Sequence, residues 1–387
     1  MANVTEESVV EVLNSVTATA FPTLAEFSGI KDADIFVAYI ALLLMALIPI
    51  YIGSHWSLSP KKDGNDKEPP LTTKEAAMFP LYASGFLLGL YAIFKIFGKD
   101  YINFILSIYF VLIGAVSIGH VLTRPLRNII QFLGLGRYLT AYKLSLTRNE
   151  EVDLFNLTFD YSNIFSLLVG SVVGAVYFKH KQWMANNLFG LSLCICGIES
   201  VSLGTYKIGL ILLGGLFLYD IFWVFGTDVM VTVATSFDAP VKLLFPKDLA
   251  FFESSNSRSF FLLGLGDIVV PGTLYFPLSF SHHEALTLAC AGIFIAFLLR
   301  FDKRKSEKKA HFSKVYFWTG FLAYIIGLIG TVLVMHFSKA SQPALLYLVP
   351  SCVGSTFLAA AIRRELPELF AYSDEDEKKK ISEKKQE

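Results

Sequence analysis

Long apolar runs recur along the whole chain, and they limit its fold more than any other feature. A membrane-spanning helix needs about 20 mostly apolar residues. Of the 387 residues, 54% are apolar and only 17% are charged, against about 25% charged in ordinary soluble domains. One or two soluble cores could not bury so much apolar surface. We therefore expect an all-α polytopic membrane protein, with candidate spans at 33–52, 76–97, 102–123, 161–178, 186–204, 208–228, 259–278, 283–301, 315–336 and 342–362.

The basic residues indicate how many of these runs cross the membrane. Cytosolic loops carry an excess of Lys and Arg. With the N-terminus outside and nine crossings, 24 of the 33 basic residues are cytosolic, whereas ten crossings leave only 11 there. We therefore expect nine transmembrane helices, with 259–301 crossing once. The predicted parts are an outside tail (1–32), a membrane domain (33–362) and a cytosolic tail (363–387).

Two aspartates lie inside apolar runs, where one acid costs about 2.5–3.5 kcal/mol to insert. Asp220 lies about eight residues before the end of its run, and Asp267 about eight residues into the next. Antiparallel neighbouring helices would bring both carboxyl groups to the same depth. Either acid alone is explained by an interhelical hydrogen bond, but the matched pair indicates a shared site.

Two carboxyl groups in a low-dielectric site share one proton, which suits them to acid–base chemistry. One can activate a water while the other protonates the carbonyl oxygen of a peptide bond. This chemistry needs no metal and no cofactor, and we expect neither. The 33 basic and 33 acidic residues balance, so there is no net field to attract nucleic acid, which we do not expect as a partner.

The residues beside the two acids fit such a site, although each also has a simpler explanation. Gly264 and Gly266 permit close backbone approach or unwinding, or else ordinary small-residue helix packing. Tyr219 either donates a hydrogen bond near Asp220 or packs. Pro343 begins the last run, where a lone proline is usually a first-turn residue.

Together these residues resemble the three sequence signatures of the GxGD intramembrane aspartyl proteases. The stretches FGTDVMVTVATSFDAPVKLLFP and QPALLYLVP are similar to the signal peptide peptidase family. An outside N-terminus argues against the presenilin branch, whose orientation is opposite. The matching residues are Tyr219-Asp220, Gly264-Leu265-Gly266-Asp267 and Gln342-Pro343-Ala344-Leu345.

The resemblance implies a presenilin-like fold and an aspartic endopeptidase that cleaves residual signal peptides and type II-oriented segments in the endoplasmic reticulum membrane. It implies that Asp220 and Asp267 are the catalytic dyad. The implied partners are signal peptides, helical transmembrane substrates, membrane lipid, further copies of the chain and membrane-protein degradation machinery. The other implied roles are active-site support from Tyr219, Gly264, Leu265 and Gly266, and substrate binding by Pro343, Ala344 and Leu345.

Two short motifs bear on location. Lys384 and Lys385 end the chain as KKxx, which resembles a cytosolic di-lysine signal for retrieval to the endoplasmic reticulum; the alternative is a solvated charge run. Asn3 begins the sequon Asn3-Val-Thr5 on the outer side, a candidate glycosylation site. We expect a multi-pass protein of this membrane with a luminal N-terminus and a cytosolic C-terminus.

One segment departs from the family pattern. After Pro271-Gly272, about twenty residues precede the apolar stretch that resumes at Ile293. Removing 273–292 joins 259–272 to 293–301 as one span and restores nine crossings. We interpret 273–292 as an in-frame insertion, from splicing or from a gene-model error.

Two other functions compete with proteolysis. In a proton-coupled transporter two intramembrane acids would relay protons, but the inverted repeats that would favour transport are not evident. A non-proteolytic quality-control factor would keep its stability and its partners after both aspartates were replaced.

Overall fold

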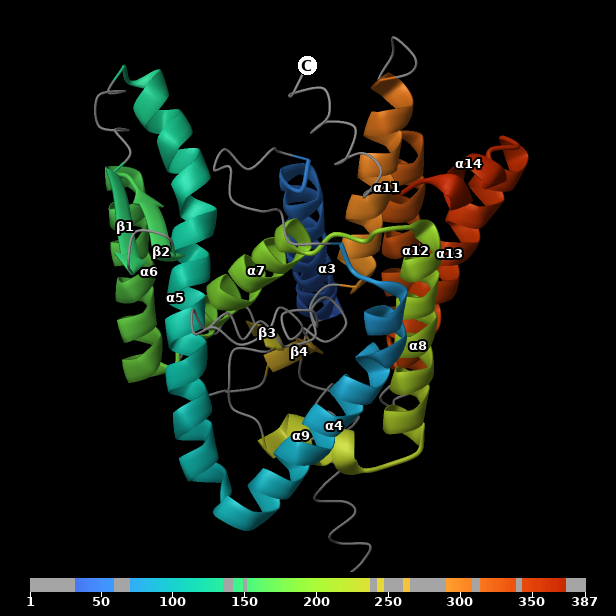
Figure 1. Cartoon of the computed structure of the whole chain (residues 1–387). Coiled ribbons are helices and arrows are strands. Elements are labelled where there is room, and N and C mark those ends of the chain that lie inside the picture. Colours follow the sequence, from blue (N-terminus) through green and yellow to red (C-terminus); the bar gives the residue numbers. More distant parts are fainter. Residues whose placement is uncertain are drawn as a thin grey trace, which may run out of the picture.

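The computed structural model describes residues 32–58, 70–134, 142–148, 152–236, 242–246, 260–264, 290–307, 314–338 and 343–373. These form a helical bundle with two small antiparallel sheets (Figure 1). The helices are α3 (Asp32–Trp56), α4 (Thr73–Phe97), α5 (Lys99–Phe132), α6 (Tyr161–His180), α7 (Trp183–Ser200), α8 (Tyr206–Phe225), α9 (Val229–Ser236), α11 (Cys290–Glu307), α12 (Val315–Ser338), α13 (Leu345–Ile362) and α14 (Leu366–Ala371); the strands are β1 (Tyr142–Arg148), β2 (Val152–Phe159), β3 (Lys242–Pro246) and β4 (Phe260–Gly264).

Seven helices in the described part of the chain are long and apolar enough to cross a membrane: α3, α4, α5, α6, α8, α12 and α13. Large apolar side chains remain exposed on their outer faces, as at Leu218, Ile326 and Ile362, which are 67–74% exposed. Such surface suits lipid rather than water. The all-α polytopic class is confirmed, while the count of nine crossings stays a prediction.

Two further helices, α7 and α11, fill the inside of the bundle. The first ten residues of α11 are all buried, and 293–299 are at most 1% exposed. The helix lies against α3, α7, α8 and α12. Its polar second half continues the predicted run 283–301 to Glu307.

Helix α7 crosses obliquely between α5 and α3 (Figure 1). It is not among the seven candidate spans, because Asn186, Asn187 and Glu199 lower its mean hydropathy.

Small residues bring α5 and α6 together along much of their length. A Cβ atom added at Gly170 would lie 2.2 Å from the backbone oxygen of Ala115. The β1–β2 hairpin joins the two helices. The predicted span 102–123 lies within α5, which continues beyond it through an amphipathic stretch to Phe132.

The prediction of a helical span from residue 259 is wrong at its start. Residues 260–264 form β4, which pairs antiparallel with β3, with Leu262 opposite Leu244 and Gly264 opposite Lys242. A short apolar run such as Phe-Phe-Leu-Leu fits a buried strand as well as a helix, and periodicity alone cannot separate the two. The pairing with β3 decides between them.

The predicted cytosolic tail, which starts at residue 363, begins with a segment that packs against the bundle. Helix α14 packs against α8, with Leu369 fully buried and Tyr372 5% exposed. A β-bridge joins Ser373 to Thr205, just before α8. The packed part of the chain therefore extends to Ser373.

Candidate active site

Helix α8 carries Asp220, the one acid among its twenty residues. Thr205 caps the helix by accepting a hydrogen bond from the Ile208 amide. The buried residues of α8 recur at helical spacing, so they form one stripe facing the bundle. Asp220 lies on this stripe and is 5% exposed. The sequence prediction that this carboxyl group is buried is confirmed.

The Asp220 carboxylate faces the first residue of α13. The backbone N–H of Leu345 donates a hydrogen bond to Oδ2 of Asp220, with a donor–acceptor distance of 3.2 Å. The first amides of a helix have no partner within the helix, and Pro343 has no N–H at all. Asp220 thus satisfies a helix-terminal donor at the positive end of the helix dipole. Pro343, Ala344 and Leu345 are all buried at this contact.

Within the described part of the chain, Tyr219 packs against an aromatic ring and makes no hydrogen bond to Asp220. Its ring lies 6.3 Å from that of Trp223, centroid to centroid, in a tilted arrangement. The Trp223 indole N–H in turn donates to the Ser84 hydroxyl on α4, at 3.0 Å. Among the described residues Tyr219 therefore has a packing role, and its support of the active site stays a prediction.

The third predicted group is only partly described. Gly264 ends β4 opposite Lys242, so the chain enters the GxGD sequence from a paired strand. Its position in the chain is three residues before Asp267. Leu265, Gly266 and Asp267 lie outside the described residues, as do Asn3, Lys384, Lys385 and 273–289 of the proposed insertion.

Asn187 was not predicted from the sequence, yet it holds β3, the partner of the strand that leads to this site. Asn187 is 5% exposed on α7. Its Nδ2 donates to the Leu244 carbonyl at 2.7 Å, and its Oδ1 accepts from the Leu244 amide at 2.8 Å. One turn earlier on α7, Trp183 makes an edge contact with Phe245. Two adjacent asparagines inside an apolar run were the signal that could have pointed here.

A third intramembrane acid, Glu199, is paired. Its carboxylate forms an ion pair with Arg124 and a hydrogen bond with Nε2 of His120 at 3.0 Å, both from α5. The Arg124 guanidinium also lies over the Trp56 ring of α3, 4.6 Å from its centroid. This cluster ties α3, α5 and α7 together, so Glu199 has a structural explanation.

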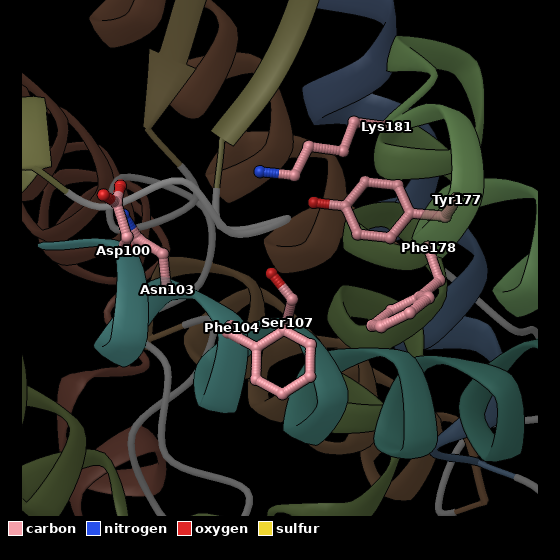
Figure 2. Close-up of a pocket in the computed structure, with 7 residues that line it drawn as sticks. All are labelled: Asp100, Asn103, Phe104, Ser107, Tyr177, Phe178 and Lys181. Atoms are coloured by element: carbon pink, nitrogen blue, oxygen red, sulfur yellow. The ribbon is translucent and has the colours of Figure 1, made fainter.

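A separate cavity of about 420 Å³ lies between the N-terminal part of α5 and the C-terminal end of α6. Figure 2 shows the Lys181 amine and the Tyr177 hydroxyl directed into the same space as Ser107. Of the predicted site residues that the structure describes, none lines this cavity, and Asp220 is not part of its wall. Among the described residues, no group of three or more His, Cys, Asp or Glu side chains is arranged to hold a metal.

Comparison with known proteins identifies the family. The signal peptide peptidase family model matches residues 62–283 and 288–376. Human signal peptide peptidase is 43% identical over 348 residues, which are 88% of this chain and 85% of the human protein. The mouse protein of that name is 44% identical over 88% of this chain and 84% of its own. Intramembrane protease 2 of Caenorhabditis elegans is 40% identical over 60% of this chain and 49% of its own.

The chain belongs to the signal peptide peptidase family. It is therefore an intramembrane aspartic protease. Asp220, a buried acid, is a candidate catalytic residue of such an enzyme. The match to the family breaks between residues 283 and 288. This break falls inside the segment 273–292, which is predicted from the sequence to be an insertion.

Proposed function

We propose that this protease cleaves residual signal peptides and type II-oriented membrane helices in the endoplasmic reticulum membrane, with Asp220 and Asp267 as its catalytic dyad. The observation that supports this most directly is the contact between Asp220 and the start of α13. It places a buried carboxylate beside Pro343, Ala344 and Leu345, which the resemblance assigns to substrate binding. The human and mouse relatives are named signal peptide peptidases.

The chemistry follows from two carboxyl groups that share one proton. The ionised group takes a proton from a water molecule as the water oxygen bonds to the carbonyl carbon, while the protonated group donates to the carbonyl oxygen. The resulting gem-diol then collapses. Its carbon–nitrogen bond breaks as the nitrogen receives a proton from the dyad, which leaves a new carboxyl end and a new amino end.

The substrate must be at least partly unwound at the cleavage site. In lipid, a helical peptide satisfies every backbone group internally, so its scissile carbonyl is engaged in a hydrogen bond. The dyad can reach that carbonyl only after the local helix opens. Residues that weaken a substrate helix should therefore speed its cleavage.

Location and assembly are parts of the same proposal. The terminal Lys384 and Lys385 would retrieve the protein to the endoplasmic reticulum from a cytosolic C-terminus, and a luminal N-terminus would allow glycosylation at Asn3. Further copies of the chain and membrane-protein degradation machinery are the proposed partners.

The test replaces each aspartate with its neutral isostere. We expect Asp220→Asn and Asp267→Asn each to lower the cleavage rate of a single-span signal-peptide substrate by about a thousandfold or more. An asparagine at 220 keeps an oxygen for the Leu345 amide, so the variant should unfold at a temperature close to that of the parent protein. The matched control is Asp228→Asn, an exposed aspartate just beyond the same helix, which should cleave normally.

Substantial cleavage by either Asp220→Asn or Asp267→Asn would contradict the dyad. If both variants lost proton flux across vesicles while proteolysis persisted, the acids would serve transport instead. Immunofluorescence of the Lys384→Ala/Lys385→Ala variant checks the location separately, since loss of retrieval should move the protein out of the endoplasmic reticulum.

A further inference from the structure

Helices α8 and α13 are joined by a second hydrogen bond, far from Asp220. The hydroxyl oxygens of Tyr206 and Thr356 lie 3.1 Å apart. Both residues are fully buried. Tyr206 begins α8, and Thr356 lies in the second half of α13. The helix that carries Asp220 is therefore held to α13 near both of its ends.

The two contacts lie on matching faces of the two helices. Tyr206 and Asp220 are 14 residues apart, about 21 Å along α8, and 14 steps of 100° return to within about 40° of the same direction. Leu345 and Thr356 are 11 residues apart, about 16 Å along α13, and return to within about 20°. Two contacts so far apart limit both sliding and rotation of one helix against the other, which a single contact cannot do.

The direction of the Tyr206–Thr356 bond follows from the other contact of Thr356. Its Oγ1 lies 2.9 Å from the Cys352 carbonyl oxygen one turn earlier on α13. A carbonyl can only accept, so the single hydroxyl hydrogen of Thr356 is used there. Tyr206 must then donate to Thr356. The phenol is the group that depends on this bond, because Thr356 keeps a partner within its own helix.

The Tyr206 ring is fixed by aromatic neighbours, so its hydroxyl is presented in one place. The Phe294 ring of α11 lies 5.6 Å away, centroid to centroid. The Phe370 ring of α14 makes an edge contact at 5.2 Å. Next to it, a Cβ atom at Gly209 would lie 2.9 Å from the Phe294 ring. The start of α8 is thus wedged against α11 and α14, while its hydroxyl reaches α13.

We propose that Tyr206 and Thr356 are positioning residues that set the register of Asp220 against the first turn of α13. This role rests on the proposed catalytic function of Asp220. The hydrogen bond fixes α8 along and about its axis. The Leu345 amide therefore meets the carboxylate at the position where the reaction occurs, and loss of the bond lets the helix shift.

The experiment uses the full-length protein in lipid nanodiscs with a single-span signal-peptide substrate. We expect Tyr206→Phe and Thr356→Val each to lower kcat about tenfold, with KM within about twofold. Thr356→Ser keeps the acceptor and should restore kcat to near the parent value. The double variant should be no slower than the slower single variant, because both remove one interaction. The control Thr331→Val removes another buried threonine hydroxyl, bonded within α12, and should leave kcat unchanged.

Thermal unfolding tests the direction of the bond. Thr356→Val strands a buried phenol, whereas Tyr206→Phe strands nothing, so Thr356→Val should lower Tm more. The double variant should recover part of that loss. Equal Tm values for the two single variants would overturn the assigned direction.

The kinetic outcomes separate this role from the proposed function. If Asp220→Asn is inactive but Tyr206→Phe keeps the parent kcat, the positioning role fails and the dyad stands. The positioning role also fails if only KM changes or if Thr356→Ser is as slow as Thr356→Val. If Asp220→Asn still cleaves, the proposed function fails, and the positioning role fails with it.

Discussion

Polar side chains inside this apolar bundle mark the points where its helices are joined. Asp220 accepts from the amide that begins α13, Asn187 binds the backbone of β3, and Glu199 pairs with two basic residues of α5. A buried polar group without a partner is costly, and lipid offers it none. Each of these residues therefore fixes one neighbouring element in one place, and the elements fixed this way include those that flank the site.

Asn187 gives the first prediction at this scale, because all of its hydrogen-bonding positions are occupied. Besides its two bonds to Leu244, its Nδ2 lies 3.5 Å from the Met45 sulfur, and its Oδ1 accepts from Asn186 at 3.5 Å. Asn187→Leu would leave the N–H and C=O of Leu244 unpaired. We expect the free energy of unfolding to fall by about 2 kcal/mol, with faster amide exchange in Lys242–Pro246 and Phe260–Gly264.

Hydrogen exchange read by mass spectrometry checks this prediction peptide by peptide. Ser192→Ala is the control, because Ser192 is also buried on α7 but its hydroxyl bonds within that helix, to the Leu188 carbonyl. Unchanged exchange in both strands of the Asn187→Leu protein would show that the strand is held by other contacts.

Sequence reasoning could find some of these residues and not others, for a physical reason. A charge in an apolar run is conspicuous by itself, so Asp220 was predicted correctly as a buried acid. The bond between Tyr206 and Thr356 joins residues 150 positions apart, and each reads alone as an ordinary helix residue. Asn187 binds the backbone of a strand 57 positions away, so no side-chain pattern announces its partner.

At the scale of elements, length and hydropathy identified the helices well but misplaced several ends. A helix does not stop where its apolar run stops, so α5 continues to Phe132 and α11 to Glu307. Strand β4 was missed because its hydrogen-bonding partner, β3, lies in another segment of the sequence. Pairing of that kind depends on tertiary structure, which local hydropathy does not contain.

Close approach of α5 and α6 gives a prediction for these elements. Because a Cβ atom at Gly170 meets a backbone oxygen rather than a flexible side chain, Gly170→Ala should force the helices apart. We expect the free energy of unfolding to fall by about 2 kcal/mol, as in other overpacked sites. The control is Gly330→Ala on α12, where nothing lies within 4 Å of the added atom. That change should instead stabilise the helix, by up to about 1 kcal/mol.

Thermal or denaturant unfolding in one detergent compares the two glycine variants directly. If Gly170→Ala were as stable as the parent protein, the two helices would have to lie further apart than the structure shows.

At the scale of the whole molecule, the two buried helices bear on the number of crossings. Seven described helices qualify as spans by length and composition, and α7 and α11 would bring the crossings to the nine that the basic residues predict. Helix α7 falls short of the composition of a span because Asn186, Asn187 and Glu199 lower its mean hydropathy; neighbouring helices rather than lipid cover these side chains. In α11 the enclosed residues 290–299 are apolar, and the charges that exclude it lie in its second half.

The last prediction concerns the segment 273–292. The first turn of α11 shows where the joined residues would lie if this segment were removed. Gly292 packs closely in α11, where an added Cβ atom would lie 2.6 Å from a methyl group of Ile198. Deleting 273–292 leaves Gly272 directly before Ile293, so a glycine keeps this place. Pro271 would then fall in the first turn of the helix, where proline is well tolerated. We expect the shortened protein to fold, to keep a cytosolic C-terminus and to cleave a signal-peptide substrate at least as fast as the full chain.

Three measurements on the shortened protein check this expectation: its Tm, the labelling of a single cysteine added to its C-terminus by a membrane-impermeant reagent, and its kcat. A matched deletion of twenty residues within α12 should abolish folding, which shows that the assay detects a lost span. If removal of 273–292 likewise abolished folding or moved the C-terminus to the lumen, the segment would be an integral part of the bundle. The family match breaks inside this segment, between residues 283 and 288, so residues 284–287 are the part of it that the family model does not cover.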